Sequence, residues 1–335
     1  MAPYNQAVAV RLAENQPNDR KVYEGTIDPT WNIGNVPCYA LALILQSCIQ
    51  HQASTPHVDP LHISAHFLRP TNSQVPFKVY VQTVKTGKGF SNLVAEFRQE
   101  DSVRITSHAI FGVNGPTDDM PDLTLKPPSS YARRHPLYLH PSEGERHPMR
   151  NLWNFHKHIA WAYDDKLTSL NAPDHPSRTN SSTVGGGGLE WGGYLQFESP
   201  TERLTNAYIP FLADMFINTI NLLPKSEFGS GLGTSWFPTM TLAIEFKFPI
   251  SQLDPSNHSM RNVGLYSLGR FVNNPQRRHD VYVEVWSAPS NIGEGEPQDG
   301  WRDEQFCLAT ATQMALTVPI ALNIKNGKKK TDSKL

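Results

Sequence analysis

Two ten-residue stretches, LHISAHFLRP at residues 61–70 and MTLAIEFKFP at residues 240–249, have the pattern of the same β-strand in two copies. Apolar and polar residues alternate in both copies, and Phe and Pro fall at the same places in each. Each copy follows a helix-like apolar stretch and precedes further alternating strands. The repeated unit is therefore a whole domain rather than a local motif.

The length and charge of the chain agree with this organisation. Its 335 residues fit two domains of about 150 residues each. We predict an N-terminal domain at 1–118, a Pro-, His- and Gly-rich linker at 119–190, a C-terminal domain at 191–324 and a basic tail at 325–335. The 30 Lys and Arg residues balance 31 Asp and Glu residues, which argues against nucleic acid or an anionic membrane as partner. A small or apolar ligand is expected instead.

The apolar runs and the cysteines indicate a soluble protein of a reducing compartment. The longest apolar run, at 38–45, is far below the ~18 residues that suggest a membrane span. The N-terminus lacks the pattern of a secretory signal peptide. Cys38, Cys48 and Cys307 lie in apolar or strand-like segments, so we expect buried, inert thiols and no disulfide framework.

The last three residues, Ser333, Lys334 and Leu335, match a peroxisomal address. This predicts binding to the peroxisomal import receptor through an accessible tail. The alternative is a solvated basic tail, with Lys328 to Lys330, on a cytoplasmic protein.

The secondary structure expected for the two halves follows the same order. In the first half an apolar helix at 36–52, with Pro37 in its first turn, is followed by strands at 61–69, 77–85, 93–99 and 103–111. In the second half a helix at 207–223 is followed by strands at 240–248, 263–272, 280–287 and 306–317. A helix that is apolar on nearly every face must be enclosed, so we expect each sheet to wrap around its helix. The linker is expected to hold short helical pieces, such as 151–161, and to pack over the halves or form a lid.

Other motifs in the chain are weaker signals. The segment Gly229-Ser230-Gly231-Leu232-Gly233-Thr234 lacks the Lys of a phosphate-binding loop. No Gly-x-Ser-x-Gly elbow occurs, which disfavours a serine hydrolase. His156 and His158 are interpreted as surface residues, because no cysteine or carboxylate lies at a ligand spacing from them.

The two copies, the element order and several strings together resemble the type II acyl-CoA thioesterase family. The resemblance covers most of the chain outside the linker and the tail. The string HISAHFLRP at 62–70 is similar to a strand of that family, with Phe-Leu-Arg-Pro intact, and DVYVEVW at 280–286 resembles its fungal thioesterase-like branch. The resemblance implies an α+β double hotdog, with two antiparallel sheets that are each wrapped around a long central helix. It also implies an acyl-CoA substrate, no metal or redox cofactor, and a homo-oligomer.

The resemblance also implies an active site in the second half. The family uses an Asp on the helix, a Thr at the start of the next strand and a Gln on the final strand. The matching residues here are Asp214, Thr239 and Gln313. The first half has Gly112 where Gln313 falls in the repeat, so one site is expected. After Thr239 the family continues Ile-Asp-His, whereas this chain has Met-Thr-Leu.

These three residues are able to hold a water for attack on a thioester carbonyl. Asp214 would act as general base or orient the water, and the Thr239 hydroxyl and Gln313 carboxamide would fix it from other sides. The expected activity is hydrolysis of acyl-CoA to free CoA and a carboxylic acid. A purely structural role for Asp214 and Gln313 is the alternative interpretation of the residues. At the level of function, the alternative is a double hotdog that binds acyl-CoA or a metabolite without hydrolysis, in specialised metabolism. Aromatic residues that could line an acyl groove, or simply pack in the core, are Phe211, Phe216, Trp236 and Phe246.

Overall fold

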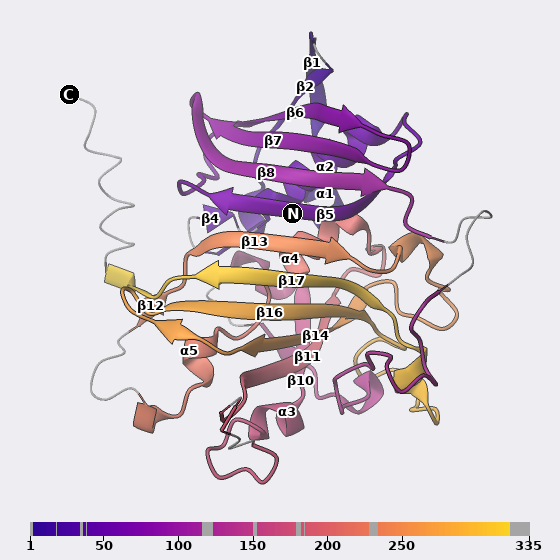
Figure 1. Ribbon diagram of the computed structural model, residues 1–335, viewed down its shortest axis with the longest axis vertical. Coiled ribbons are helices and arrows are strands. Elements are labelled where there is room, and N and C mark those ends of the chain that lie inside the picture. The colour runs from indigo at the N-terminus through magenta and orange to yellow at the C-terminus, as the bar shows by residue number, and fades with distance from the viewer. Residues whose placement is uncertain are drawn as a thin grey trace.

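One large antiparallel sheet forms the body of the protein in the computed structural model (Figure 1). The structure describes residues 3–17, 19–33, 36–37, 39–115, 123–149, 153–178, 182–183, 185–227 and 234–321. The tail with Ser333 to Leu335, the glycine-rich loop at 229–233 and Cys38 lie outside these described residues. The strand order in the sheet is β1-β2-β6-β7-β8-β5-β13-β17-β16-β14-β11-β10-β9, and β15 pairs with β16.

The first half contributes six strands to this sheet. They are β1 (Arg11–Gln16), β2 (Arg20–Gly25), β5 (Asp59–Phe67), β6 (Phe77–Thr86), β7 (Ser91–Gln99) and β8 (Ser102–Gly112). Its other elements are helices α1 (Tyr4–Ala7) and α2 (Ala40–Gln52), a 3-10 turn at Pro29–Trp31, and the short strands β3 (Asn32–Ile33) and β4 (Val36–Pro37).

The second half contributes the remaining strands. They are β9 (His147–Pro148), β10 (Ile159–Tyr163), β11 (Leu189–Phe197), β13 (Thr239–Phe246), β14 (Asn262–Gly269), β15 (Val272–Asn273), β16 (Arg278–Ser287) and β17 (Cys307–Ala315). A separate pair consists of β12 (Ser235–Trp236) and β18 (Val318–Pro319). The helices are α3 (Asp165–Ser169), α4 (Ile209–Leu212) and α5 (Thr219–Leu222). The 3-10 turns are Pro141–Glu143, Asn154–Lys157, Asn206–Tyr208, Lys225–Glu227, Ile250–Gln252 and Trp301–Glu304.

The strand order has an internal symmetry centred on β5 and β13. Outward from this central pair, β8 corresponds to β17, β7 to β16, β6 to β14, β2 to β11 and β1 to β10. The two strands that the sequence repeat singles out therefore lie side by side, with Ile63 opposite Ile244. Because β5 and β13 pair with each other in antiparallel orientation, neither is an edge strand, and the two halves form one continuous sheet. This corrects the expectation of two separate sheets.

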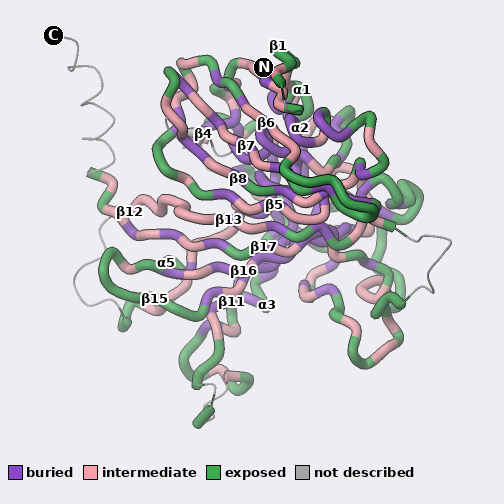
Figure 2. Tube along the Cα trace, turned by 45° about the horizontal axis from the view of Figure 1, so that its top comes forward, coloured by how far each residue is buried: buried purple, intermediate pink, exposed green. Residues whose placement is uncertain are grey.

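Helix α2 packs against the inner face of the first-half strands, and residues along most of its length are buried (Figure 2). The predicted start at residue 36 was wrong, because Val36 and Pro37 form β4 instead of a first helical turn. Tyr39 ties the start of the helix to the preceding turn, since its hydroxyl accepts from the Asp28 N–H at 2.6 Å and donates to the Asp28 carbonyl at 3.1 Å. The helix begins directly after this anchor.

The second half lacks the long helix that was predicted at 207–223. The chain there forms the turn Asn206–Tyr208 and α4, passes through an irregular segment and then enters α5. Asn218 and Thr219 explain the break, because their side chains contact β16 rather than the local backbone. Asn218 Oδ1 lies 3.3 Å from His279 Nε2, and Thr219 Oγ1 donates to the Asp280 carbonyl at 3.1 Å. The second-half helix is therefore short and interrupted.

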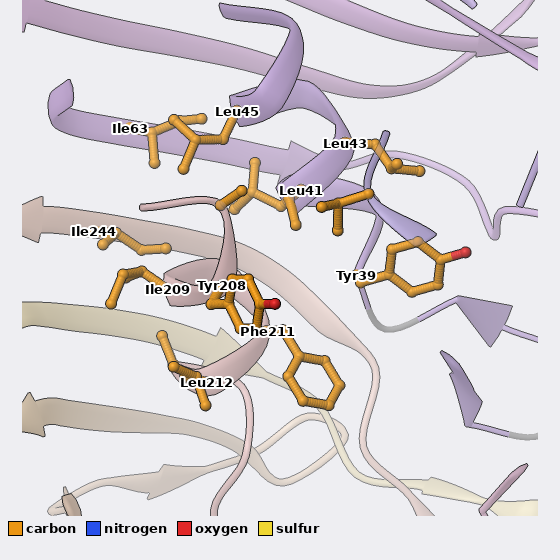
Figure 3. Packing of buried hydrophobic residues seen from close by; sticks show 14 of the residues in the cluster. Tyr39, Leu41, Leu43, Leu45, Ile63, Tyr208, Ile209, Phe211, Leu212 and Ile244 are labelled. Carbon is orange, nitrogen blue, oxygen red and sulfur yellow. The ribbon is translucent and has the colours of Figure 1, made fainter. Parts of the chain in front are cut away.

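Residues of α2 and α4 meet over the central strand pair (Figure 3). Leu41 of α2 lies near Tyr208 and Ile209, and Ile63 and Ile244 of the central strands lie alongside (Figure 3). All five side chains are at most 3% exposed. This core extends across both halves and fixes the position of α4 against the sheet.

The segment predicted as a linker takes part in the sheet. The helix expected at 151–161 is absent from its described residues, where the 3-10 turn Asn154–Lys157 leads into β10. β10 pairs with both β9 and β11, so β9 and β10 extend the edge of the sheet. Among the described residues, no helix has the length and hydropathy needed to span a membrane.

The two described cysteines are free. Cys48 is fully buried, and burial raises the pKa of its thiol to about 12. Burial is also the main reason that the pKa of Cys307 is raised to about 12. Both thiols therefore stay protonated near neutral pH and are poor nucleophiles.

Candidate active site

Asp214, Thr239 and Gln313 come together at one end of the second-half sheet. Asp214 lies in the turn after α4, Thr239 is the first residue of β13, and Gln313 lies on β17. The Gln313 amide donates from Nε2 to Asp214 Oδ1 at 2.5 Å and to Thr239 Oγ1 at 3.0 Å. One amide group thus connects the helix turn to the first residue of the neighbouring strand.

The sequence of β17 explains how an amide comes to face the interior. Ala309, Ala311 and Ala315 are buried on the same side of the strand as Gln313, which is 5% exposed. Three small side chains leave space above the strand for the turn after α4. Gln313 is the long polar residue in this row, so its amide reaches the carboxylate of Asp214.

A β-bulge sets the direction of Thr239. The pairing of β13 with β17 shifts between Thr239 and Thr241, so Met240 is an extra residue in the ladder. Such a bulge re-aims the side chains next to it. Here it places the Thr239 hydroxyl beside the Gln313 amide.

The pKa of the Asp214 carboxyl group is well above the ordinary value for an Asp. Burial raises its pKa from 3.8 to about 7, and hydrogen bonds from Gln313 and Thr239 partly oppose that rise. The residue keeps some solvent-accessible surface, as does Thr239. A carboxylate with a pKa near 7 is a stronger base than an ordinary Asp and is still ionised in about half of the molecules at neutral pH.

The described residues of the first half do not form an equivalent site. The matching bulge in β5 lies between Pro60 and His62, which places Pro60 at the position of Thr239. By strand register the counterpart of Gln313 is Ala109, because Ala109 lies opposite Ile63 as Gln313 lies opposite Leu242. The assignment of Gly112 to this position was therefore wrong by three residues. Helix α2 also contains no acidic residue.

His279 is a neighbour of the site that the sequence analysis did not single out. It is 1% exposed and points inward from β16, and its Cα partner in β17 is Ala315, which also pairs with Thr239. Its ring also contacts Phe237, with 5.9 Å between ring centroids. Burial lowers its pKa, so the ring is neutral near pH 7. The alternation of His279, Val281 and Val283 on one face of β16 is the signal that identifies it as an inward residue.

The aromatic residues proposed for an acyl groove differ in their surroundings. Phe211 is fully buried among the rings of Tyr4, Trp31 and Phe155, at centroid distances of 5.1, 5.7 and 5.5 Å. It therefore belongs to the core rather than to an open groove. Phe216 and Trp236 are half-buried, and Phe246 is 6% exposed.

No three His, Cys, Asp or Glu side chains are grouped to hold a metal ion in the part of the chain that the structure describes. His156 makes a hydrogen bond from Nδ1 to the Trp153 carbonyl at 2.8 Å. His158 is partly buried and packs at 5.5 Å from Trp31.

An antiparallel sheet that packs against α2 is the architecture of a hotdog-fold protein. A hotdog protein from Alicyclobacillus acidocaldarius matches 94% of this chain over 98% of its own length, with a TM-score of 0.64 and 15% identity. Within this fold class, residues 27–112 match the family model of the acyl-CoA thioesterase N-terminal domain. The match covers α2 and β5 to β8, about a quarter of the chain.

Two other solved structures cover nearly the whole chain. A protein assigned as a thioesterase II from Thermobifida fusca YX is 18% identical over 95% of this chain and 98% of its own, with a TM-score of 0.64. The acyl-CoA thioesterase II TesB2 from Mycobacterium marinum is 12% identical over 94% and 96%, with a TM-score of 0.56. At these identities the likeness establishes the fold. No curated protein sequence matches the chain.

Proposed function

We propose that the protein is an acyl-CoA thioesterase that hydrolyses an acyl-CoA thioester to free CoA and a carboxylic acid. Asp214, Thr239 and Gln313 are the proposed catalytic residues. The observation that carries the proposal is the double hydrogen bond of the Gln313 amide to Asp214 and Thr239, around a carboxyl group whose pKa is raised to about 7. The match of residues 27–112 to the thioesterase domain supports the same reaction class.

The proposed reaction begins with a water bound beside the Asp214 carboxylate. The carboxylate accepts a proton as the water oxygen bonds to the thioester carbonyl carbon, which gives a tetrahedral oxyanion. The oxyanion then collapses, the carbon–sulfur bond breaks, and the thiolate of CoA takes the proton back from Asp214. Thr239 and Gln313 orient the water and the carboxylate, which removes much of the entropic cost of bringing them together.

An isotope experiment tests this reaction directly. Purified protein is given short-, medium- and long-chain acyl-CoA esters in H₂¹⁸O, and both free thiol and the carboxylic acid are measured. One ¹⁸O atom in the acid, together with one thiol released per acid, is expected for attack by water. Folded protein that releases no thiol from any ester would contradict the proposal and favour a binding protein, for example in specialised metabolism.

The architecture and location are part of the proposal. The symmetric strand order around β5 and β13 supports two fused hotdog units, the second with a shortened helix. The sequence Ser333-Lys334-Leu335 supports delivery to peroxisomes by the import receptor. A fluorescent fusion that enters peroxisomes equally well without these three residues would contradict the targeting proposal.

A further inference from the structure

A surface cavity lies at the same end of the sheet as the candidate active site. Its volume is about 270 Å³, and its apolar wall is formed by Ile220 and Leu223 at α5 and by Val272 of β15. Its polar lining consists of Asn273, Asn274, Arg277 and Glu227. α5 and β15 lie together with β12 at one end of the molecule, on the left in Figure 2. The cavity thus combines an apolar wall with amide and guanidinium groups.

The backbone of Arg277 is held by hydrogen bonds, while its side chain forms no ion pair with the residues that the structure describes. Gln276 and Arg277 both adopt left-handed backbone conformations, with φ of 64° and 48°. The Arg277 carbonyl accepts hydrogen bonds from His279 Nδ1 at 3.0 Å and from Thr317 Oγ1 at 3.3 Å. Non-glycine residues rarely adopt this conformation, and such strain is often found at functional sites. Arg277 is half-buried as a residue, and among the described residues no carboxylate pairs with its guanidinium.

The hairpin around the cavity has a local excess of positive charge. Arg270, Arg277 and Arg278 lie within nine residues, in a chain whose net charge is only −1. The nearby Asp280 is already engaged, because its Oδ1 accepts from the backbone N–H groups of Arg270 and Phe271 at 3.2 and 2.7 Å. Glu227 lines the same cavity and is exposed to solvent, as are Arg270 and Arg278. The three arginines therefore outnumber the carboxylates of Asp280 and Glu227 by one, which leaves the hairpin a small local excess of positive charge.

In the register of the sheet, His279 lies between the cavity and the catalytic residues. Arg277 lies two residues before His279, which is separated from Thr239 by the single strand β17. Two strand spacings correspond to about 10 Å between His279 and Thr239. A thioester bound at Asp214 would thus have the cavity within reach of the flexible arm that links its sulfur to the nucleotide of CoA.

We infer that this cavity binds the phosphate-bearing part of the CoA substrate, and that Arg277 is the residue that recognises a phosphate. The inference rests on the proposed thioesterase function and assigns a substrate-recognition site to it. Asn273 and Asn274 supply donors and acceptors for the amides of the pantetheine arm, and Ile220 and Leu223 contact its apolar parts. A guanidinium is well suited to phosphate because it donates two parallel hydrogen bonds.

Arg278 provides a matched control for Arg277. It is the next residue, carries the same charge and is exposed on the opposite face of β16 from His279, and it does not line the cavity. Arg277→Gln and Arg278→Gln therefore remove the same charge from adjacent positions. The two variants are compared on an acyl-CoA and on the matching N-acetylcysteamine thioester, which has no phosphate.

Arg277→Gln is expected to lower kcat/KM for the acyl-CoA by about 5- to 50-fold, and Arg278→Gln by less than about twofold. Both variants should keep kcat/KM for the N-acetylcysteamine thioester within about twofold of the unmodified protein, because that substrate cannot contact Arg277 through phosphate. Equal losses in the two variants on acyl-CoA would overturn the inference. So would an equal loss for both substrates in Arg277→Gln, which would indicate a structural role.

Binding of free CoA, measured by calorimetry, separates this inference from the proposed activity. Weaker CoA binding by Arg277→Gln than by Arg278→Gln supports the site even if no thioester is hydrolysed. Unmodified protein that does not bind CoA, or equal binding by the two variants, would overturn the site whether or not hydrolysis is observed.

Discussion

Gln313 on β17 donates a hydrogen bond of 2.5 Å to Asp214, a residue 99 positions earlier in the chain. The two residues lie on opposite layers of the second half, one on the sheet and one on the turn that covers it. A contact between the layers positions the carboxylate, and the same amide also contacts Thr239. The proposed activity depends on this contact.

Replacement of Gln313 by Leu should lower kcat without unfolding the protein. Leu preserves most of the volume but removes both donors that hold Asp214 and Thr239, so we expect kcat to fall roughly a hundredfold. Acyl-CoA hydrolysis under saturating substrate measures the effect. The control is Thr312→Val, since Thr312 is exposed on the other face of the same strand. If Gln313→Leu keeps more than half of the activity, the amide has no catalytic role.

The pH dependence of hydrolysis should report the ionisation of Asp214. The carboxylate is the active form and its pKa is about 7, so kcat/KM should rise about tenfold per pH unit below pH 7 and level off above it. Because the Gln313 hydrogen bond lowers this pKa, the residual activity of Gln313→Leu should have its midpoint at a higher pH. A midpoint near 4 in the unmodified protein would disagree with a buried carboxylate as the base.

Asp214→Asn should stabilise the protein at neutral and alkaline pH. The pKa of Asp214 is higher in the folded state than the value of 3.8 for an unperturbed Asp, so the folded state binds more protons between pH 4 and 7. The free energy of unfolding of the unmodified protein therefore falls through this range because of Asp214. Asn cannot ionise, so the free energy of unfolding of Asp214→Asn does not fall in this way. We expect the variant to be about 1–3 kcal/mol more stable than the unmodified protein at pH 8, and this difference should disappear below pH 4.

Urea unfolding at pH 4, 6 and 8 measures this stability difference. Asp299→Asn is the control, because Asp299 is exposed in a surface turn. A stability gain of Asp214→Asn that does not change with pH would show that the carboxylate is not strained by burial.

Tyr208→Phe should weaken the attachment of the N-terminal segment to the second half. The Tyr208 hydroxyl donates to Glu202 Oε2, and Glu202 Oε1 accepts from the Tyr4 backbone N–H at 2.6 Å. Glu202 is only 2% exposed, so the loss of one donor leaves a buried carboxylate less well satisfied. We expect a loss of about 1–3 kcal/mol in urea unfolding. Tyr131→Phe, at a side chain that is 85% exposed, should change the stability by less than about 0.5 kcal/mol. Equal effects of the two substitutions would rule out this anchoring role.

The sequence was most informative where the pattern is local. The alternation around Ile63 and Ile244 predicted two strands of one kind, and these two strands pair at the centre of the sheet. Asp214, Thr239 and Gln313 were selected by resemblance, and the structure brings their side chains into contact. Their catalytic role stays a prediction.

The residue-by-residue correspondence between the two halves could not be predicted from the sequence pattern. The last strand of the first half was aligned with β17 three residues out of register, so the counterpart of Gln313 was placed at Gly112 rather than at Ala109. The correct register follows from the pairing of β8 with β5 and of β17 with β13, and no strand alone encodes it.

Tertiary contacts also explain the missed strand β11. Gly192 and Gly193 weaken a strand prediction, yet close packing requires both. A Cβ at Gly192 would lie 2.4 Å from Leu137 Cδ2, and one at Gly193 would lie 2.6 Å from the Ala162 carbonyl oxygen. The residues that leave no room for a side chain at Gly192 and Gly193 are 25 or more residues away in the chain. The local sequence pattern therefore could not predict that glycine is needed there.

Thiol release from acyl-CoA at pH 8, measured for Asp214→Asn beside the unmodified protein and Asp299→Asn, tests most directly whether Asp214 is the catalytic base. The unmodified protein and Asp299→Asn are expected to hydrolyse the ester, while Asp214→Asn should lose at least about a hundredfold in kcat and remain folded. Asn preserves the shape and the acceptor for Gln313 but cannot take a proton from water. Hydrolysis by Asp214→Asn within a few-fold of the unmodified rate would contradict the assignment of Asp214 as the base.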